Sequence, residues 1–192
     1  MNRDSGSANQ TALALANAGG RSLSLKIAMV VLGTIFLALA SYIEIPMIPV
    51  PINMQTFAVT LIGAVYGWKL GAVTIIVWLL EGAIGLPVLS GGVGGAHYFV
   101  GPTAGYLFAF PLVAALTGWL AERGWNGDRI GLAFVSMLSG NALCLLIGAA
   151  WLSTTIGVEQ AIVHGVTPFI IGGVLKSALA AVSLKFLPSA PR

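Results

Sequence analysis

One lysine lies where a charged side chain is costly. Lys176 occurs in the segment PFIIGGVLKSALAA, whose other residues are apolar or small. An ammonium group at membrane depth normally faces a cavity or an anionic partner. We therefore predict that Lys176 meets the negative group of a ligand. The alternative is a lysine whose stem lies along apolar surface while its ammonium reaches the membrane interface.

A glycine-rich stretch, LPVLSGGVGGAHYFVGPTAGY at 86–106, is the second feature that could bind a ligand. Irregular backbone at membrane depth is tolerated only where protein buries it or where it lines a cavity. Glycine lets the backbone approach a ligand closely, so that N–H and C=O groups can bond the edge of a polar ring. We predict a loop that covers the ligand through Gly91, Gly92, Gly94 and Gly95.

Polar and aromatic side chains near these glycines could complete the site. Thr103 offers a hydroxyl close to the positive N-terminal end of a predicted helix. Tyr98 and Phe99 are predicted pocket walls, with simple loop packing as the alternative. Other aromatic residues at the same level are wall or interface residues: Tyr42, Trp78, Tyr106 and Trp151. These side chains, with Lys176, predict a small, mostly apolar ligand that carries a carboxylate at one end.

The composition places these residues in a membrane. Of the 192 residues, 57% are hydrophobic and 8% are charged, and the mean hydropathy is +0.94. A soluble domain has about 25% charged residues, so the chain is predicted to be an all-α membrane protein. The formal net charge of +3 comes from basic residues that never cluster, which excludes a nucleic-acid surface.

Known catalytic and metal-binding patterns are missing from the sequence. There is no HExxH, GxSxG or GxxxxGK[ST] motif, and His97 and His164 are solitary. The single cysteine, Cys144, allows no disulfide or thiolate metal site. We expect no enzyme activity, no cofactor and no metal, and any ATP hydrolysis must come from a partner.

Six apolar segments predict a compact bundle of six transmembrane helices. The proline run IPMIPVPIN forbids the first helix to continue into the second. Residues 1–22 are predicted to be a disordered cytoplasmic tail, 23–187 the membrane domain that binds substrate, and 188–192 a short cytoplasmic tail. The predicted helices cover 23–45, 52–67, 70–86, 103–121, 130–151 and 167–187.

The basic residues predict the orientation of the bundle. All nine except Lys176 lie on one side if both termini are cytoplasmic, in agreement with the positive-inside rule. The other three connections, 46–51, 87–102 and 152–166, contain no lysine or arginine. We expect a multi-pass protein of the bacterial cytoplasmic membrane whose glycine-rich loop faces outward.

Four stretches resemble a known family. PVPINMQTFAVTLIGAVYGWKLGAV, EGAIGLPVLSGGVGG, VGPTAGYLFAFPLVAAL and PFIIGGVLKSALAA are similar, in this order, to the BioY family over about residues 40–185. Members are the biotin-binding S components of energy-coupling factor (ECF) transporters. The resemblance implies a six-helix bundle that captures biotin from outside. It also implies a coupling transmembrane subunit and paired ABC-type ATPases as partners, although some members act alone.

The resemblance also implies roles for particular residues. Lys176 matches the family lysine that meets the biotin carboxylate, and the four loop glycines match the loop over the ring system. Gln55 and Thr56 match a polar pair after the proline run. Asn141 is a plausible polar lining residue, with a hydrogen bond between helices as the alternative.

The chain departs from the family pattern at two positions. Members read GD-x-x-K before the lysine, and the aspartate accepts the ureido N–H groups; here that position is Gly173. Some members also have a polar residue where this chain has Val93. Losing a charged hydrogen-bond partner costs about 1.5 to 3 kcal/mol, or about one to two decades of affinity. Either His97 or loop carbonyls replace the aspartate, or the chain binds biotin more weakly, or its ligand preference differs.

A second class of function stays open on the sequence alone. Glu44 and Glu81 lie near the outer ends of predicted helices, where an acid could relay protons. This pattern would suit a stand-alone, proton-coupled transporter for a small carboxylate or vitamin. Uptake that needs no coupling module and stops with a protonophore would favour that reading.

Overall fold

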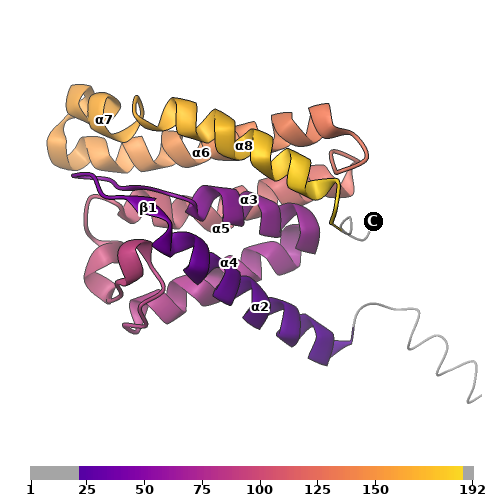
Figure 1. The fold of residues 1–192 in the computed structure, drawn as a ribbon. Coiled ribbons are helices and arrows are strands. Elements are labelled where there is room, and N and C mark those ends of the chain that lie inside the picture. The colour runs from indigo at the N-terminus through magenta and orange to yellow at the C-terminus, as the bar shows by residue number, and fades with distance from the viewer. Residues whose placement is uncertain (1–21, 188–192) are drawn as a thin grey trace, which may run out of the picture.

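The computed structural model describes residues 22–187 (Figure 1), so the predicted tail at 188–192 and all but the last residue of the one at 1–22 lie outside it. Seven α-helices, two short strands and two short 3₁₀ turns make up the described chain. The helices are α2 Leu23–Tyr42, α3 Gln55–Tyr66, α4 Trp68–Ala83, α5 Ala104–Glu122, α6 Ile130–Ile156, α7 Val158–Gly165 and α8 Phe169–Leu184. The strands are β1 Glu44–Ile45 and β2 Ile52–Asn53, and the turns are η1 Ser90–Gly92 and η2 Ala96–Phe99.

The predicted all-α membrane bundle is confirmed, since each of the six predicted segments contains one helix. Of the described helices, α2, α5 and α6 are each long and apolar enough to cross a membrane alone. Helices α7 and α8 pass the same test as a pair that is bent by 45°. Helices α3 and α4 have 12 and 16 residues, shorter than the roughly 20 that a straight crossing requires.

The predicted connection at 152–166 contains a helix that was not predicted. Helix α6 continues to Ile156, and α7 follows after a single residue, Gly157. Gly157 has φ 84°, a left-handed conformation that favours glycine, and its N–H donates to the carbonyl of Ser153. The chain therefore changes direction at Gly157, in a bend between α6 and α7.

The proline run forms a ribbon rather than an open loop. Helix α2 ends at Tyr42, earlier than the predicted Ile45, and β1 then pairs with β2 in antiparallel register. Glu44 lies opposite Asn53 in this pair. Prolines lack the N–H that a helix needs, so the chain between the strands turns back on itself. The ribbon, residues 43–54, brings Asn53 next to the start of α3.

The three connections without lysine or arginine meet at one end of the bundle, here called the cavity end. The Trp151 indole donates to the carbonyl of Gly101 at 3.0 Å, joining α6 to the loop 84–103. The Tyr106 hydroxyl donates to the carbonyl of Gly165 at 2.8 Å, joining α5 to α7. In Figure 1, α7 and β1 lie together at the left of the bundle.

The remaining turns lie at the opposite end of the bundle, here called the basic end. A Glu122 carboxylate oxygen accepts from the backbone N–H of Trp68 at 3.1 Å, so α5 caps the start of α4. A negative charge favours the N-terminus of a helix because of its partial positive charge. Gly127 lies against the backbone of Leu184. The start of α4 with Lys69, the α5–α6 connection with Arg123 and Arg129, and the end of α8 with Lys185 are thus gathered at this end.

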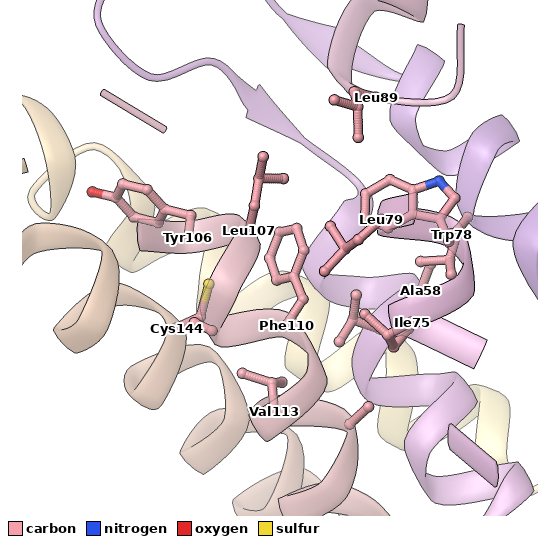
Figure 2. Packing of buried hydrophobic residues seen from close by; sticks show 14 of the residues in the cluster. Ala58, Ile75, Trp78, Leu79, Leu89, Tyr106, Leu107, Phe110, Val113 and Cys144 are labelled. Atoms are coloured by element: carbon pink, nitrogen blue, oxygen red, sulfur yellow. The ribbon is translucent and has the colours of Figure 1, made fainter. Parts of the chain in front are cut away.

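Buried apolar residues fill the bundle below the cavity end. Figure 2 shows Phe110 of α5 between Trp78 of α4 and the side of the bundle that holds Cys144 of α6. The Trp78 and Phe110 ring centroids are 6.1 Å apart, a favourable spacing for tilted aromatic rings. A second cluster, which includes Met137 and Leu184, fills the basic end.

Three glycines allow α3, α4 and α5 to touch backbone to backbone. A Cβ at Gly63 of α3 would collide with the carbonyl and Cα of Ala114 on α5. A Cβ at Gly71 of α4 would lie 3.0 Å from the Cα of Gly63. A Cβ at Gly118 of α5 would collide with the backbone of Gly67 and Trp68, where α3 turns into α4. Small residues at such crossings permit the close packing that holds membrane helices together.

Candidate functional site

A cavity of about 340 Å³ lies at the cavity end of the bundle. The ribbon, the loop 84–103 and helices α3, α5, α6 and α8 all contribute to its wall. Small-molecule sites occupy about 300 to 1,000 Å³, so the cavity is of a size for one compact ligand. Its wall is mostly apolar, and Tyr106, Leu107, Phe110 and Cys144 belong both to this wall and to the packed core in Figure 2.

Lys176 is on the wall of this cavity, near the middle of α8. Its Nζ donates to the backbone carbonyl of Asn53 at 3.0 Å. An ammonium group has three donors, so this bond leaves donors for a ligand. The side chain is half-buried and its ammonium bonds the ribbon at the cavity, whereas the alternative considered from the sequence had the ammonium reach the membrane interface.

A chain of hydrogen bonds connects the lysine to both loops. Asn53 Nδ2 donates to Gln55 Oε1 at 3.0 Å and to Ser90 Oγ at 2.8 Å. Ser90 Oγ donates in turn to a carboxylate oxygen of Glu44. Gln55 is buried, and its Nε2 donates to Ser41 of α2 at 3.0 Å. Asn53 therefore holds the ribbon, the glycine-rich loop and Lys176 in one network.

Ser90→Ala is expected to loosen the contact between the ribbon and the glycine-rich loop. It removes a hydrogen bond to a carboxylate, a type that contributes about 1.5 to 3 kcal/mol. Amide hydrogen exchange at 44–53 and 88–92 should then be at least about tenfold faster. Ser139→Ala is the matched control, because that hydroxyl bonds only its own helix at Val135. Unchanged exchange in both variants would contradict a joining role for Ser90.

Eight of the residues predicted for the site lie on the wall of this single cavity. They come from regions far apart in the sequence: Gln55, His97, Tyr98, Thr103, Tyr106, Asn141, Gly173 and Lys176. Thr56, next to Gln55, is on the wall as well. Thr103 precedes α5, which begins at Ala104, and it makes no capping hydrogen bond with its side chain.

The other five predicted residues are not on the cavity wall. Gly91, Gly92, Gly94, Gly95 and Phe99 belong to the same loop, but side chains of Leu89, Ser90 and Val93 line the cavity there instead. Gly91 lines a more open hollow outside it. That the four glycines cover a ligand's ring stays a prediction.

The structure gives the loop glycines a packing reason. A Cβ at Gly94 would collide with the carbonyl of Leu86, where the loop crosses its own start. Gly92 has φ 71° and lies against the ring of Tyr42, and Gly91 has φ 72° and lies against the Glu44 carboxylate. Glycine tolerates both the left-handed backbone and these close approaches. The loop is therefore tightly folded against α2 and the ribbon.

Three of the aromatic residues predicted at this level hold the loop through its backbone. The Trp78 indole donates to the Val88 carbonyl at 3.1 Å, and the Tyr42 hydroxyl donates to the Pro87 carbonyl at 2.9 Å. Trp151 binds the loop near its end, at Gly101. Indole N–H and phenol O–H groups are common partners for otherwise unpaired polar atoms. These three side chains are anchors for the loop rather than walls of the cavity.

Two polar wall residues, Asn53 and Ser90, were missed from the sequence. Both are in short irregular segments, and no helical spacing connects them to Lys176. Apolar wall residues, such as Phe169 and Leu145, were missed because they look like any other lipid-facing or core residue. The proximity of Asn53 to a proline run and to Gln55 was the one usable signal.

Glu44 and the histidines have no metal-binding arrangement. Within residues 22–187, no group of three or more His, Cys, Asp or Glu side chains could hold a metal ion. His164 is exposed on α7 and bonds Gln160 on the same helix at 3.1 Å. His97 lies on the cavity wall and packs against Tyr98, with ring centroids 4.1 Å apart and ring planes tilted by 41°.

These features define a multi-pass helical membrane protein whose bundle holds a small-molecule cavity at one end. Residues 10–191 match the model of the BioY family. The chain is 35% identical over 157 residues to a probable biotin transporter BioY of Pyrococcus horikoshii, covering 82% of this chain and 92% of that one. It is 39% identical over 154 residues to a biotin transporter BioY of Rhizobium etli, covering 76% and 82%. The chain belongs to the BioY family.

A solved structure has the same fold. The crystal structure at 2.1 Å of the S-component for biotin from an ECF-type ABC transporter is 28% identical and superposes with a TM-score of 0.75. The similarity covers 87% of this chain and 94% of that chain. The arrangement of helices described above is therefore the arrangement of a known transporter component.

Proposed function

We propose that this chain is a biotin-binding S component that takes biotin into the cavity beside Lys176. The observation that carries this proposal is the single ammonium on the wall of an otherwise mostly apolar cavity. Biotin has a fused, largely apolar ring system at one end and a carboxylate at the other. Relatives that cover most of the chain are named biotin transporters, which supports the same ligand.

The helices around the cavity also favour an anion. Gln55 and Thr56 begin α3, and Thr103 directly precedes α5, and all three residues line the cavity. The N-terminus of a helix carries a partial positive charge. Two such ends and Lys176 thus present the same sign of charge to the ligand. The apolar and aromatic wall residues, such as Leu107 and Phe110, suit the ring system.

Biotin would enter from the predicted outer side through a second hollow. This hollow, of about 600 Å³, is more open and lies between the ribbon and the glycine-rich loop. Pro51, Ser90, Val93 and Tyr98 line both the hollow and the inner cavity. These four residues therefore separate the two spaces, and the ribbon and loop must part there for the ligand to pass.

Energy for transport would come from partner proteins. The sequence has no GxxxxGK[ST] motif, so the chain lacks the usual phosphate-binding loop of an ATPase. We infer that it works with a coupling transmembrane subunit and paired ABC-type ATPases, as the name of the similar crystal structure suggests. Biotin uptake that persists without such a module and stops with a protonophore would favour a stand-alone, proton-coupled transporter instead.

The proposed ligand is tested by calorimetric titration of the detergent-solubilised chain. We expect biotin to bind with one site per chain and a Kd of about 1 µM or tighter, which is about −8 kcal/mol. Pantothenate, a vitamin with a carboxylate but no fused ring system, is the control and should give no heat of binding. Equal binding of the two would show that the cavity recognises only the carboxylate, and absence of biotin binding would contradict the proposal.

A further inference from the structure

We infer that the side-chain oxygen of Asn141 accepts a ureido N–H of the bound ligand, and that the missing side chain at Gly173 opens this oxygen to the cavity. The inference rests on the proposed function, since it assigns one end of biotin to a particular atom. It concerns the end of the ligand opposite to the carboxylate that Lys176 would bind.

Asn141 is buried at the contact of α6 with α8, with an exposed fraction of 5%, and it lies on the cavity wall. A buried amide has two N–H donors and one oxygen acceptor, and buried polar groups in native structures are nearly always paired. The partners of Nδ2 and Oδ1 therefore indicate which of the two atoms is left for a ligand.

The neighbouring hydroxyl fixes which way the amide points. Ser177 Oγ donates its one hydrogen to the Gly173 carbonyl at 2.7 Å, so toward Asn141 it can only accept. Asn141 Nδ2 is 3.0 Å from this hydroxyl and 3.1 Å from the carbonyl of Met137, which is also only an acceptor. An amide turned the other way would place its oxygen against two acceptors. The nitrogen must face the protein, and Oδ1 must face away.

The oxygen left over has no protein partner. No donor of the described residues bonds Asn141 Oδ1. Within residues 22–187, two buried side-chain oxygens have neither accessible surface nor a hydrogen-bond partner, those of Thr56 and Ser136. The Asn141 oxygen is not one of them. It therefore retains access to the cavity that Asn141 lines. An acceptor held in one orientation, open to a cavity, is suited to an N–H of a ligand.

Gly173 keeps that access open. Gly173 also lines the cavity, and a Cβ there would lie 3.9 Å from Asn141 Oδ1. Any longer side chain at 173 would extend over the oxygen or beside it. The other amide oxygens on the wall already accept protein hydrogen bonds, Gln55 Oε1 from Asn53 and Asn53 Oδ1 from the Gln55 backbone.

The acceptor proposed here is neutral, which suits both ends of the ligand. A cyclic urea offers neutral N–H donors, and a neutral oxygen can pair with them without a charge. Because no carboxylate is placed at position 173 of α8, nothing on this turn of the helix competes with the ligand for Lys176, which is three residues further along. The same site should discriminate against ligands that lack the ring N–H groups.

The test compares biotin with a biotin methylated on both ring nitrogens, by calorimetric titration of the full chain. In the unaltered chain, biotin should bind at least tenfold more tightly. Asn141→Leu should reduce this ratio about tenfold, because only biotin loses a hydrogen bond. Ser183→Ala is the matched control: its hydroxyl bonds only the Leu179 carbonyl on α8, it lies outside the cavity, and it should preserve the ratio.

A second pair of variants covers the case in which Asn141→Leu does not fold. Gly173→Ala should reduce the ratio about threefold by partly covering the oxygen. Gly172→Ala should not change it, since a Cβ there has nothing within 4 Å. An unchanged ratio in Asn141→Leu, or in Gly173→Ala where that variant alone folds, would overturn this inference and leave the proposed function standing. No binding of biotin by the unaltered chain would overturn both.

Discussion

Lys176→Met is expected to abolish the retention of radiolabelled biotin by membranes that contain the protein. The variant keeps an unbranched side chain up to the ε position and removes the ammonium, so the ligand carboxylate would enter the cavity without its charge partner. Truncating one member of a buried, hydrogen-bonded charge pair costs about 2 to 5 kcal/mol or more, which is a loss of affinity of at least about 30-fold. Equilibrium retention at increasing biotin concentration measures this loss.

The control for this result is Lys185→Met. Lys185 directly follows α8 at the basic end, is exposed, and lies outside the cavity. Its substitution removes the same charge from the end of the same helix, α8, and should leave the retention of biotin unchanged. If Lys176→Met retained biotin as well as Lys185→Met did, the carboxylate would have to be held elsewhere.

Gly63→Val is expected to have the largest effect on folding. The branched side chain would collide with the Ala114 backbone and with Thr117 on α5, at the point where α3, α4 and α5 meet. Overpacking a well-packed interior costs about 1 to 3 kcal/mol or more, and here the neighbours are backbone atoms that cannot rotate away. The apparent melting temperature in detergent should fall strongly, with little folded protein recovered.

Gly131→Val is the matched substitution, because Gly131 also lies in a helix but a Cβ there meets nothing within 4 Å. It should melt close to the unaltered chain. Equal melting temperatures for Gly63→Val and Gly131→Val would show that the crossing of α3 and α5 is less tight than described.

The general architecture could be predicted because membrane helices leave strong local signals. The apolar segments, the proline run and the positions of the basic residues each act through a short stretch of chain. Lys176 could be singled out because a charge in an apolar helix is rare. Its partner, the Asn53 carbonyl, could not, because a backbone acceptor has no signature in the sequence.

The details that were missed depend on contacts between distant segments. The packing of Gly92 against Tyr42 and the bond from Ser90 to Glu44 exist only once the ribbon and the loop have folded together. Glycine content alone could not tell a backbone that touches a ligand from one that touches the protein. Helix α7 was missed for another reason: a helix of eight residues is too short for a clear apolar period.

The contact between the ligand carboxylate and Lys176 is central to the proposed function, and one measurement isolates it. The Kd values of biotin and of biotinamide, which has the same ring and tail but no negative charge, are measured for the unaltered chain and for Lys176→Met. We predict that the unaltered chain prefers biotin by at least about 30-fold, and that Lys176→Met binds the two ligands about equally. A preference for biotin that is the same in both chains would contradict the account.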